Sequence, residues 1–180
     1  EPGYVTTAIT DDALAFIDCH AGCDVPFYLS VHYTAPHSPW TGHPQDIVDE
    51  YDECAFASCP QEEIHPWAVG HQLSESCLGK REMLKGYFAA VTAMDRDIGR
   101  ILDKLEEKDL REDTLVVFVS DNGFSCGHHG FWGKGNGTYP PNMYENSIKV
   151  PFVISQPGRV PAGSVEGAMV SAYDFMPTLL

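Results

Sequence analysis

The sequence predicts an α/β protein whose mixed, mostly parallel sheet is flanked by helices. Apolar, β-branched runs of strand length occur at 27–33, 115–120 and 150–154. A long amphipathic helical pattern separates the first two runs. Alternation of buried strands with helices is typical of parallel or mixed sheets that carry helices on their faces. With 43% hydrophobic residues, the 180 residues can form one domain or a piece of one.

The helices are indicated by capping residues and by apolar spacing. Residues 10–12 combine a capping threonine with two acids, which predicts a helix start ahead of the apolar residues that follow. Apolar residues recur at helical spacing over 84–105 and predict a long helix that ends near Lys108. Residues 34–78 are rich in Pro, Gly, Ser and Cys and are predicted to be mainly loop. A further helix is expected to begin near 177–180.

The strand at 115–120 ends abruptly in an acid, an amide and a glycine. Ligands of α/β proteins bind beyond the carboxyl ends of such strands. Asp121 and Asn122 therefore present two adjacent oxygen donors, which suit a hard divalent cation. Asp-Asn-Gly is also ordinary turn chemistry, so this stretch alone leaves both interpretations open.

The segment 122–139 has no clear apolar period but contains six glycines, four aromatic residues, His128, His129 and Lys134. Disordered loops are poor in aromatic residues, whereas this one is rich in them. Glycine lets a backbone approach a ligand closely. The segment is therefore predicted to be an ordered loop packed over a functional site.

His37 follows the first predicted strand and is bracketed by two prolines that restrict the local backbone. Such a histidine can serve as a general acid near neutral pH. The alternative is a histidine that caps or packs within a loop, and the sequence around it favours that reading.

Aromatic faces for a sugar or aryl group are available on three tryptophans, although tryptophan more commonly packs in a core: Trp40, Trp67 and Trp132.

Charge and composition exclude several classes of partner. The net charge of −15 argues against nucleic acid and against an anionic membrane surface. The apolar runs are too short for a membrane-spanning helix. An anionic substrate would need local positive charge from a metal, Lys134 or Arg159. The six cysteines lack the usual zinc spacing, and one or two disulfides or none remain open.

Several motifs occur together in an order that resembles the sulfatases of the alkaline phosphatase superfamily. Lys134 lies thirteen residues after Asp121, as in many members. The resemblance extends over nearly the whole chain through Ala35-Pro36-His37-Ser38-Pro39, Ser120-Asp121-Asn122-Gly123, Gly127-His128-His129-Gly130, Tyr144-Glu145 with Lys149-Val150-Pro151, Pro157-Gly158 with Gly163, Asp174 to Leu179 and the helical segment Met94 to Leu102.

The resemblance implies a role for each matching residue. Asp121 and Asn122 would bind a divalent cation, which is most often calcium in sulfatases. His37 would protonate the leaving alcohol or hold the ester oxygen. Lys134 would contact the sulfate and neutralise developing charge, and His129 would line the substrate site. The implied fold is the alkaline phosphatase-like (sulfatase) fold, which these residues would form incompletely.

One departure from the family pattern is important. The family nucleophile is a formylglycine made from the Cys or Ser of a Cys/Ser-x-Pro-x-Arg motif, and the segment Cys59-Pro60-Gln61-Glu62-Glu63 has neither that spacing nor the arginine. The first metal-binding Asp-Asp pair is also absent. Both would lie upstream of Glu1, so residues 1–180 are expected to be part of one sulfatase-like catalytic domain and to be inactive alone.

The expected activity of the full-length parent is hydrolysis of a sulfate ester on a small substrate, a carbohydrate above all. One alternative is a phosphodiesterase or phosphonate monoester hydrolase of the same superfamily. Another is a non-catalytic protein that binds sulfated glycans. The family implies a secreted, periplasmic or lysosomal location, and the sequence does not determine the oligomeric state.

Overall fold

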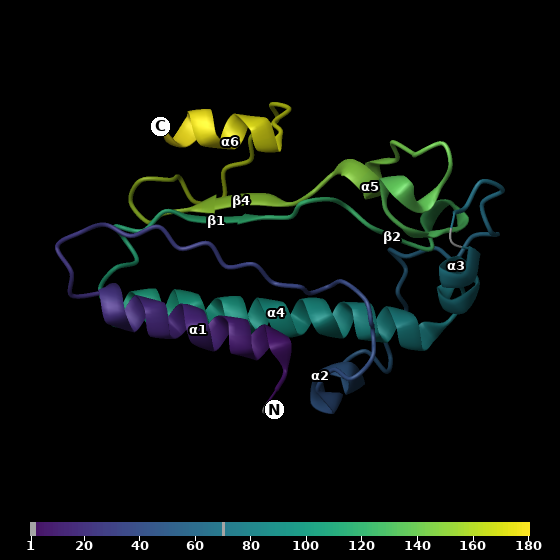
Figure 1. Cartoon of the computed structure of the whole chain (residues 1–180), viewed down its shortest axis with the longest axis horizontal. Helices are drawn as coiled ribbons and strands as arrows, with labels where there is room; N and C mark the ends of the chain where they lie inside the picture. Colours follow the sequence, from purple (N-terminus) through teal and green to yellow (C-terminus); the bar gives the residue numbers. More distant parts are fainter. Residues whose placement is uncertain (1–2, 70) are drawn as a thin grey trace.

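The computed structural model describes residues 3–69 and 71–180. Figure 1 shows a layer of two long helices, a strand pair above it, and a loop-rich part at one end. The helices and strands in chain order are α1 (Val5–His20), α2 (Gln45–Asp49), α3 (His71–Cys77), α4 (Arg81–Glu107), β1 (Val116–Val119), β2 (Ser125–Cys126), β3 (Trp132–Gly133), α5 (Glu145–Ile148), β4 (Phe152–Ser155) and α6 (Ala172–Leu179).

Helices α1 and α4 pack side by side and run in the same direction (Figure 1). Along this contact Arg100 pairs with Asp11 at 2.5 Å, and Lys108 pairs with Asp18 at 2.8 Å. The long helix predicted over 84–108 is confirmed as α4. Within the part of the chain that the structure describes, no helix is long and apolar enough to cross a membrane.

Helix α1 begins at Val5, so the predicted start at residues 10–12 is wrong. Thr10 is fully buried inside the helix, and its hydroxyl donates to the carbonyl of Thr6 at 3.0 Å instead of capping a helix end. The final helix α6 likewise begins before 177–180, because Ser171 and Asp174 form a capping box there.

Strands β1 and β4 confirm the predictions at 115–120 and 150–154, but they pair antiparallel, from Val116 opposite Ser155 to Val119 opposite Phe152. Strands β2 and β3 are also antiparallel, so a mostly parallel sheet is not found among the described residues. A parallel pair needs a crossover connection. Here the chain leaves the carboxyl end of β1 through the glycine-rich loop and enters β4 at that same end. Strand β4 therefore runs in the direction opposite to β1.

Residues 27–33 are extended but form no strand ladder, contrary to the prediction of a strand buried on both faces. Alternate side chains are half-buried and exposed, which is the period of an extended chain with one covered face. That face lies on α1, where the rings of Phe27 and Phe16 are 5.6 Å apart and the hydroxyls of Tyr33 and Thr10 are 2.8 Å apart.

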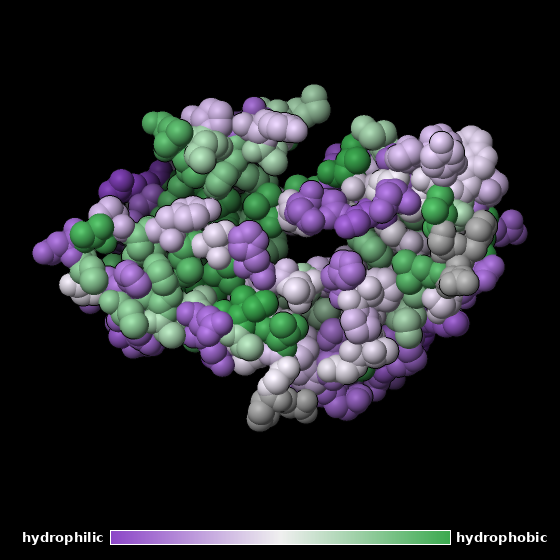
Figure 2. Space-filling model, in the orientation of Figure 1, coloured by the Kyte–Doolittle hydropathy of each residue, from purple (hydrophilic) through white to green (hydrophobic). Residues whose placement is uncertain are grey.

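The larger core cluster lies at the N-terminal end of α4, beneath the glycine-rich loop. Its buried members are Trp40, Phe56, Cys59, Cys77, Leu84, Cys126 and Trp132. Gly86 of α4 permits this packing, because a Cβ there would lie 1.9 Å from the carbonyl oxygen of Trp40. In Figure 2 hydrophobic residues gather on the left of the face, around the strand pair, and the surface is hollowed between that half and the glycine-rich half.

Candidate active site

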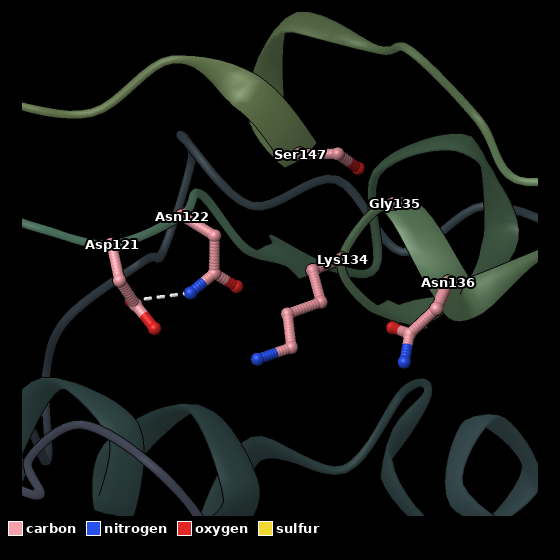
Figure 3. A pocket seen from close by; sticks show the side chains of 6 residues that line it. All are labelled: Asp121, Asn122, Lys134, Gly135, Asn136 and Ser147. Carbon is pink, nitrogen blue, oxygen red and sulfur yellow. Dashed lines mark hydrogen bonds between the residues drawn. The ribbon is translucent and has the colours of Figure 1, made fainter. Parts of the chain in front are cut away.

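An open pocket of about 360 Å³ lies at the carboxyl end of β1. Figure 3 shows Asp121 and Asn122 on one side, the Lys134 side chain extending toward them, Asn136 on the far side of Lys134, and Ser147 above. The complete lining is Asp121, Asn122, Lys134, Gly135, Asn136 and Ser147. The fold thus brings the predicted metal-binding pair and the predicted sulfate-binding lysine to one pocket.

The turn after β1 positions the two oxygen donors. The hydroxyl of Ser120 donates to the carbonyl of Asn122 at 2.9 Å, and the Asn122 amide donates to the Asp121 carboxylate. Gly123 then passes close to α5, where its N–H donates to the carbonyl of Ser147 at 3.1 Å. A Cβ at Gly123 would lie 2.1 Å from the carbonyl oxygen of Asn146, so glycine is needed for this approach.

Lys134 supplies the positive charge of the pocket. Its backbone is held by Asn142, whose amide donates to the carbonyl of Lys134 at 3.2 Å and to that of Gly135 at 3.2 Å. Among the described residues its ammonium group forms no ion pair. In a chain of net charge −15, this cation is available to an anionic ligand.

The donors in the pocket fit part of a cation site. Asp121 and Asn122 offer hard oxygen ligands, as calcium or magnesium prefers, but such ions take six or more ligands. Across residues 3–69 and 71–180, no group of three or more His, Cys, Asp or Glu side chains is arranged to hold a metal. Asp121 and Asn122 would therefore supply only part of the ligand set that such an ion takes.

His37 is exposed and does not line the pocket. Its Nδ1 lies 3.0 Å from the carbonyl oxygen of Ser38. The loop that carries it is anchored by the buried Trp40, whose ring lies 5.7 Å from that of Phe124 and 5.0 Å from that of Trp132. The loop that carries His37 is therefore packed, through Trp40, against Phe124 and Trp132 of the glycine-rich loop. The imidazole of His37 is nevertheless not among the residues that line the pocket.

His129 also lies outside the pocket lining, in a left-handed backbone conformation with φ of 58°. Its ring stacks on Tyr144 at 3.8 Å with 13° between the planes. The Tyr144 hydroxyl lies 3.3 Å from Nε2 of His65, and Nδ1 of His65 accepts from the N–H of Trp67 at 3.1 Å. Because Nδ1 is an acceptor, a neutral His65 carries its proton on Nε2 and donates it to Tyr144.

Sequence reasoning did not find Asn136 and Ser147 as pocket residues. Asn136 had one usable signal, its position two residues after Lys134 in the glycine-rich loop. Ser147 had none, because α5 reaches the pocket only through the Gly123 contact. Nothing in the sequence indicated that Tyr144 stacks on His129 or that His65 contacts Tyr144.

All six cysteines are free thiols. Gln61 joins the backbones of two of them, since its amide donates to the carbonyls of Cys59 at 2.9 Å and Cys126 at 2.8 Å. A hydrogen bond from the Cys126 thiol lowers the pKa of Cys59 to about 6. The same contact raises the pKa of Cys126, so within this pair Cys59 is the thiol that ionises first.

The geometry defines an α/β protein with a pocket at a strand end that an acid, an amide and a lysine line, and comparison with known proteins makes the class specific. The family model described as Sulfatase matches residues 2–180. The chain belongs to the sulfatase family.

Individual relatives agree with this assignment. The chain is 32% identical over 181 residues to the ulvan-active sulfatase of Formosa agariphila, covering 98% of this chain and 32% of that protein. It is 25% identical over 246 residues to the N-acetylglucosamine-6-O-sulfatase of Bacteroides thetaiotaomicron, covering 100% of this chain and 43% of that protein. The chain therefore spans less than half the length of these relatives.

A solved structure shows the same fold. Ps i-CgsB in complex with k-i-k-neocarrahexaose superposes with a TM-score of 0.69 at 26% identity, over 99% of this chain and 34% of the other. The predicted α/β class and the alkaline phosphatase-like sulfatase fold are thereby confirmed.

Proposed function

We propose that these residues are the C-terminal part of the catalytic domain of a sulfatase that hydrolyses sulfate esters of carbohydrates. The observation that carries the proposal is the convergence of Asp121, Asn122 and Lys134 on one pocket at the carboxyl end of β1. The carbohydrate class is supported by relatives that are named for N-acetylglucosamine and ulvan.

Asp121 and Asn122 would hold a divalent cation, calcium by preference, because both offer hard oxygen atoms and no imidazole lies beside them in the pocket. Such an ion would supply positive charge for the sulfate oxygens. Within this chain, the Ser120 hydroxyl and the Gly123 approach to α5 keep the two donors side by side.

Lys134 would bind the sulfate group and neutralise charge that develops as the ester bond breaks. His37 would give a proton to the leaving alcohol, provided that its loop places the imidazole beside the ester in the complete domain. His129 would contribute to substrate binding from the rim of the glycine-rich loop.

One Ser-x-Pro-x-Arg string occurs in the chain, Ser155-Gln156-Pro157-Gly158-Arg159. Ser155 is paired with Val116, at the end of β1 away from the pocket, and its hydroxyl accepts a hydrogen bond from Arg111 at 2.5 Å. Ser155 is therefore not positioned to act as the nucleophile of this pocket. We therefore assign the formylglycine and the remaining metal ligands to the rest of the full-length chain. Residues 1–180 alone should release no sulfate. A secreted, periplasmic or lysosomal location belongs to this proposal and is supported by family membership alone.

The test uses the full-length protein with calcium. We expect hydrolysis of 4-nitrophenyl sulfate or of a sulfated sugar, with little turnover of an aryl phosphodiester. Lys134→Ala should lower kcat by about 10² to 10³, the usual cost of removing one group that stabilises developing negative charge. Lys149→Ala is the matched control, because Lys149 is exposed and pairs with the exposed Glu145 at 2.9 Å, and it should change kcat less than about twofold.

Three outcomes would contradict the proposal. Preferred turnover of the phosphodiester would indicate a phosphodiesterase or phosphonate hydrolase. Binding of sulfated glycans without turnover would indicate a non-catalytic protein. Equal losses in Lys134→Ala and Lys149→Ala would remove Lys134 from the reaction.

A further inference from the structure

A short antiparallel bridge connects the segment before α3 to the end of the pocket-lining segment. Ala68 and Thr138 are the paired residues. On one side of them the N–H of Tyr139 donates to the carbonyl of Trp67 at 3.0 Å, and on the other the N–H of Val69 donates to the carbonyl of Gly137 at 2.8 Å.

This bridge determines which side chains lie together. Neighbouring residues of an extended chain point to opposite faces, and residues directly opposite in an antiparallel pair share a face. Ala68 and Thr138 are 4% and 3% exposed, so their face is the buried one. The bridge places Trp67 opposite Tyr139 in the backbone, and both side chains are on the surface, where they are 62% and 77% exposed. Val69, at 50%, extends this surface.

The aromatic pair is fixed relative to the pocket. The Asn142 amide donates to the carbonyls of Lys134 and Gly135, and the N–H of Gly137 donates to the carbonyl of Lys134 at 2.7 Å. The three residue steps from Asn136 to Tyr139 can span at most about 11 Å, so the aromatic pair begins close to the pocket wall.

Trp67 is also held in place from the other side. Its N–H donates to Nδ1 of His65, and its ring meets the His65 ring edge-on at 5.9 Å. The other two tryptophans of the chain, Trp40 and Trp132, are only 5% and 1% exposed. Trp67 is thus the tryptophan whose face is free for a ligand.

We propose that Trp67 and Tyr139 form a carbohydrate subsite, in which a sugar ring next to the sulfated one stacks on their faces. The faces of aromatic rings are electron-rich and attract the polarised C–H groups that cover one side of a pyranose. The contact needs no charge, which matters because a chain of net charge −15 repels a sulfated polymer. This inference rests on the proposed function and specifies its substrate as an oligosaccharide or longer glycan.

The kinetic test compares two kinds of substrate on the full-length protein. For hexasaccharides prepared from carrageenan and from ulvan, Trp67→Ala should raise KM about three- to tenfold, as expected for the loss of one aromatic stack. For 4-nitrophenyl sulfate, which has no second ring, KM and kcat should stay unchanged. Trp67→Phe should restore most of the oligosaccharide KM. Tyr173→Ala, at a tyrosine of α6 that is 92% exposed, is the control and should change KM and kcat for neither substrate.

A binding test separates the subsite from the reaction. Trp67 emission, assigned by difference from Trp67→Phe, should be quenched by acrylamide in the ligand-free full-length protein and protected by a hexasaccharide. If a hexasaccharide protects Trp67 from acrylamide but the protein releases no sulfate, the subsite is supported and the proposed function is contradicted. Emission that acrylamide cannot reach in the free protein would show that another part of the chain covers Trp67 and would overturn the inference. Equal KM changes for both substrates, no change for either, or no protection by either hexasaccharide would also overturn it.

Discussion

The glycine-rich loop and the β1–β4 pair differ in a way that their secondary structure does not suggest. The only strands in the described loop are β2 and β3, with two residues each, yet Phe131 and Trp132 are 0% and 1% exposed. Strands β1 and β4 have a regular ladder, yet Val119 and Val153 are 48% and 55% exposed. Helix α6, which follows the strands, has no buried residue.

The comparison shows that side chains of this chain are buried by close backbone contacts in the loop rather than by the hydrogen-bond ladder of the strand pair. Gly130 lies against the carbonyl of Glu63, and the side-chain amides of Gln61 and Asn142 donate to backbone carbonyls of the loop. Lys134 belongs to the glycine-rich loop, whereas Asp121 and Asn122 follow the end of β1. The pocket therefore lies at the junction of the two regions.

The largest expected effect is the loss of a buried aromatic ring from the loop. Trp132→Ala should lower the opening free energy of the loop by about 3–5 kcal/mol, the usual cost of a large cavity. Val153→Ala on the exposed strand face should cost less than about 1 kcal/mol. Native-state hydrogen exchange of the full-length protein measures both regions in one experiment. Similar values for the two variants would contradict the difference in packing.

A glycine pair separates backbone strain from steric contact. Gly130 and Gly163 have φ of 73° and 71°, but a Cβ at Gly130 would lie 1.8 Å from the Glu63 carbonyl oxygen, whereas none meets Gly163 within 4 Å. Gly163→Ala should cost about 1 kcal/mol from the left-handed conformation alone. Gly130→Ala should cost about 1–3 kcal/mol more, because backbone must move. Thermal unfolding of the two variants is the measurement, and equal shifts in Tm would rule out the contact.

The stack of His129 on Tyr144 should matter more than the hydroxyl of that tyrosine. Tyr144→Phe keeps the ring and should cost less than about 1 kcal/mol, whereas Tyr144→Leu should cost about 1–2 kcal/mol through the lost stack. Histidine ring resonances of the full-length protein report this directly, since only Tyr144→Leu removes the ring-current shift of His129. Tyr139→Phe, at an exposed tyrosine of the same loop, is the control. A His129 signal that is the same in both Tyr144 variants would exclude the stack in solution.

The smallest expected effect is a change in thiol reactivity. The pKa of Cys59 is lowered to about 6 by the Cys126 thiol, so Cys59 is mainly thiolate above that pH and loses its charge as pH falls through it. Cys126→Ala should shift the midpoint of iodoacetamide labelling at Cys59 upward toward 9, and Cys126→Ser, which keeps a donor, should shift it less. Mass spectrometry of the labelled peptide gives the midpoint. A midpoint near 9 in the unsubstituted protein would contradict the thiol contact.

Local sequence signals predicted the elements that depend on local periodicity. The apolar period over 84–105 gave α4, and two β-branched runs gave β1 and β4. The same kind of run at 27–33 gave an extended segment without a ladder, because a ladder needs a partner edge that the run itself does not specify. Thr10 was misplaced for a similar reason, since a threonine can cap a helix or bind the carbonyl four residues earlier.

The sequence alone determined the chemistry available to this protein: the order of motifs places it among sulfatases, and Asp121, Asn122 and Lys134 are its hard oxygen donors and its cation. Only the tertiary structure decided that these three share a pocket with Asn136 and Ser147, that His37 lies outside it, and that Trp67 rather than Trp40 or Trp132 presents a free face. The physical reason is that residue type fixes what a side chain can bind, whereas proximity and exposure depend on contacts between segments far apart in the chain.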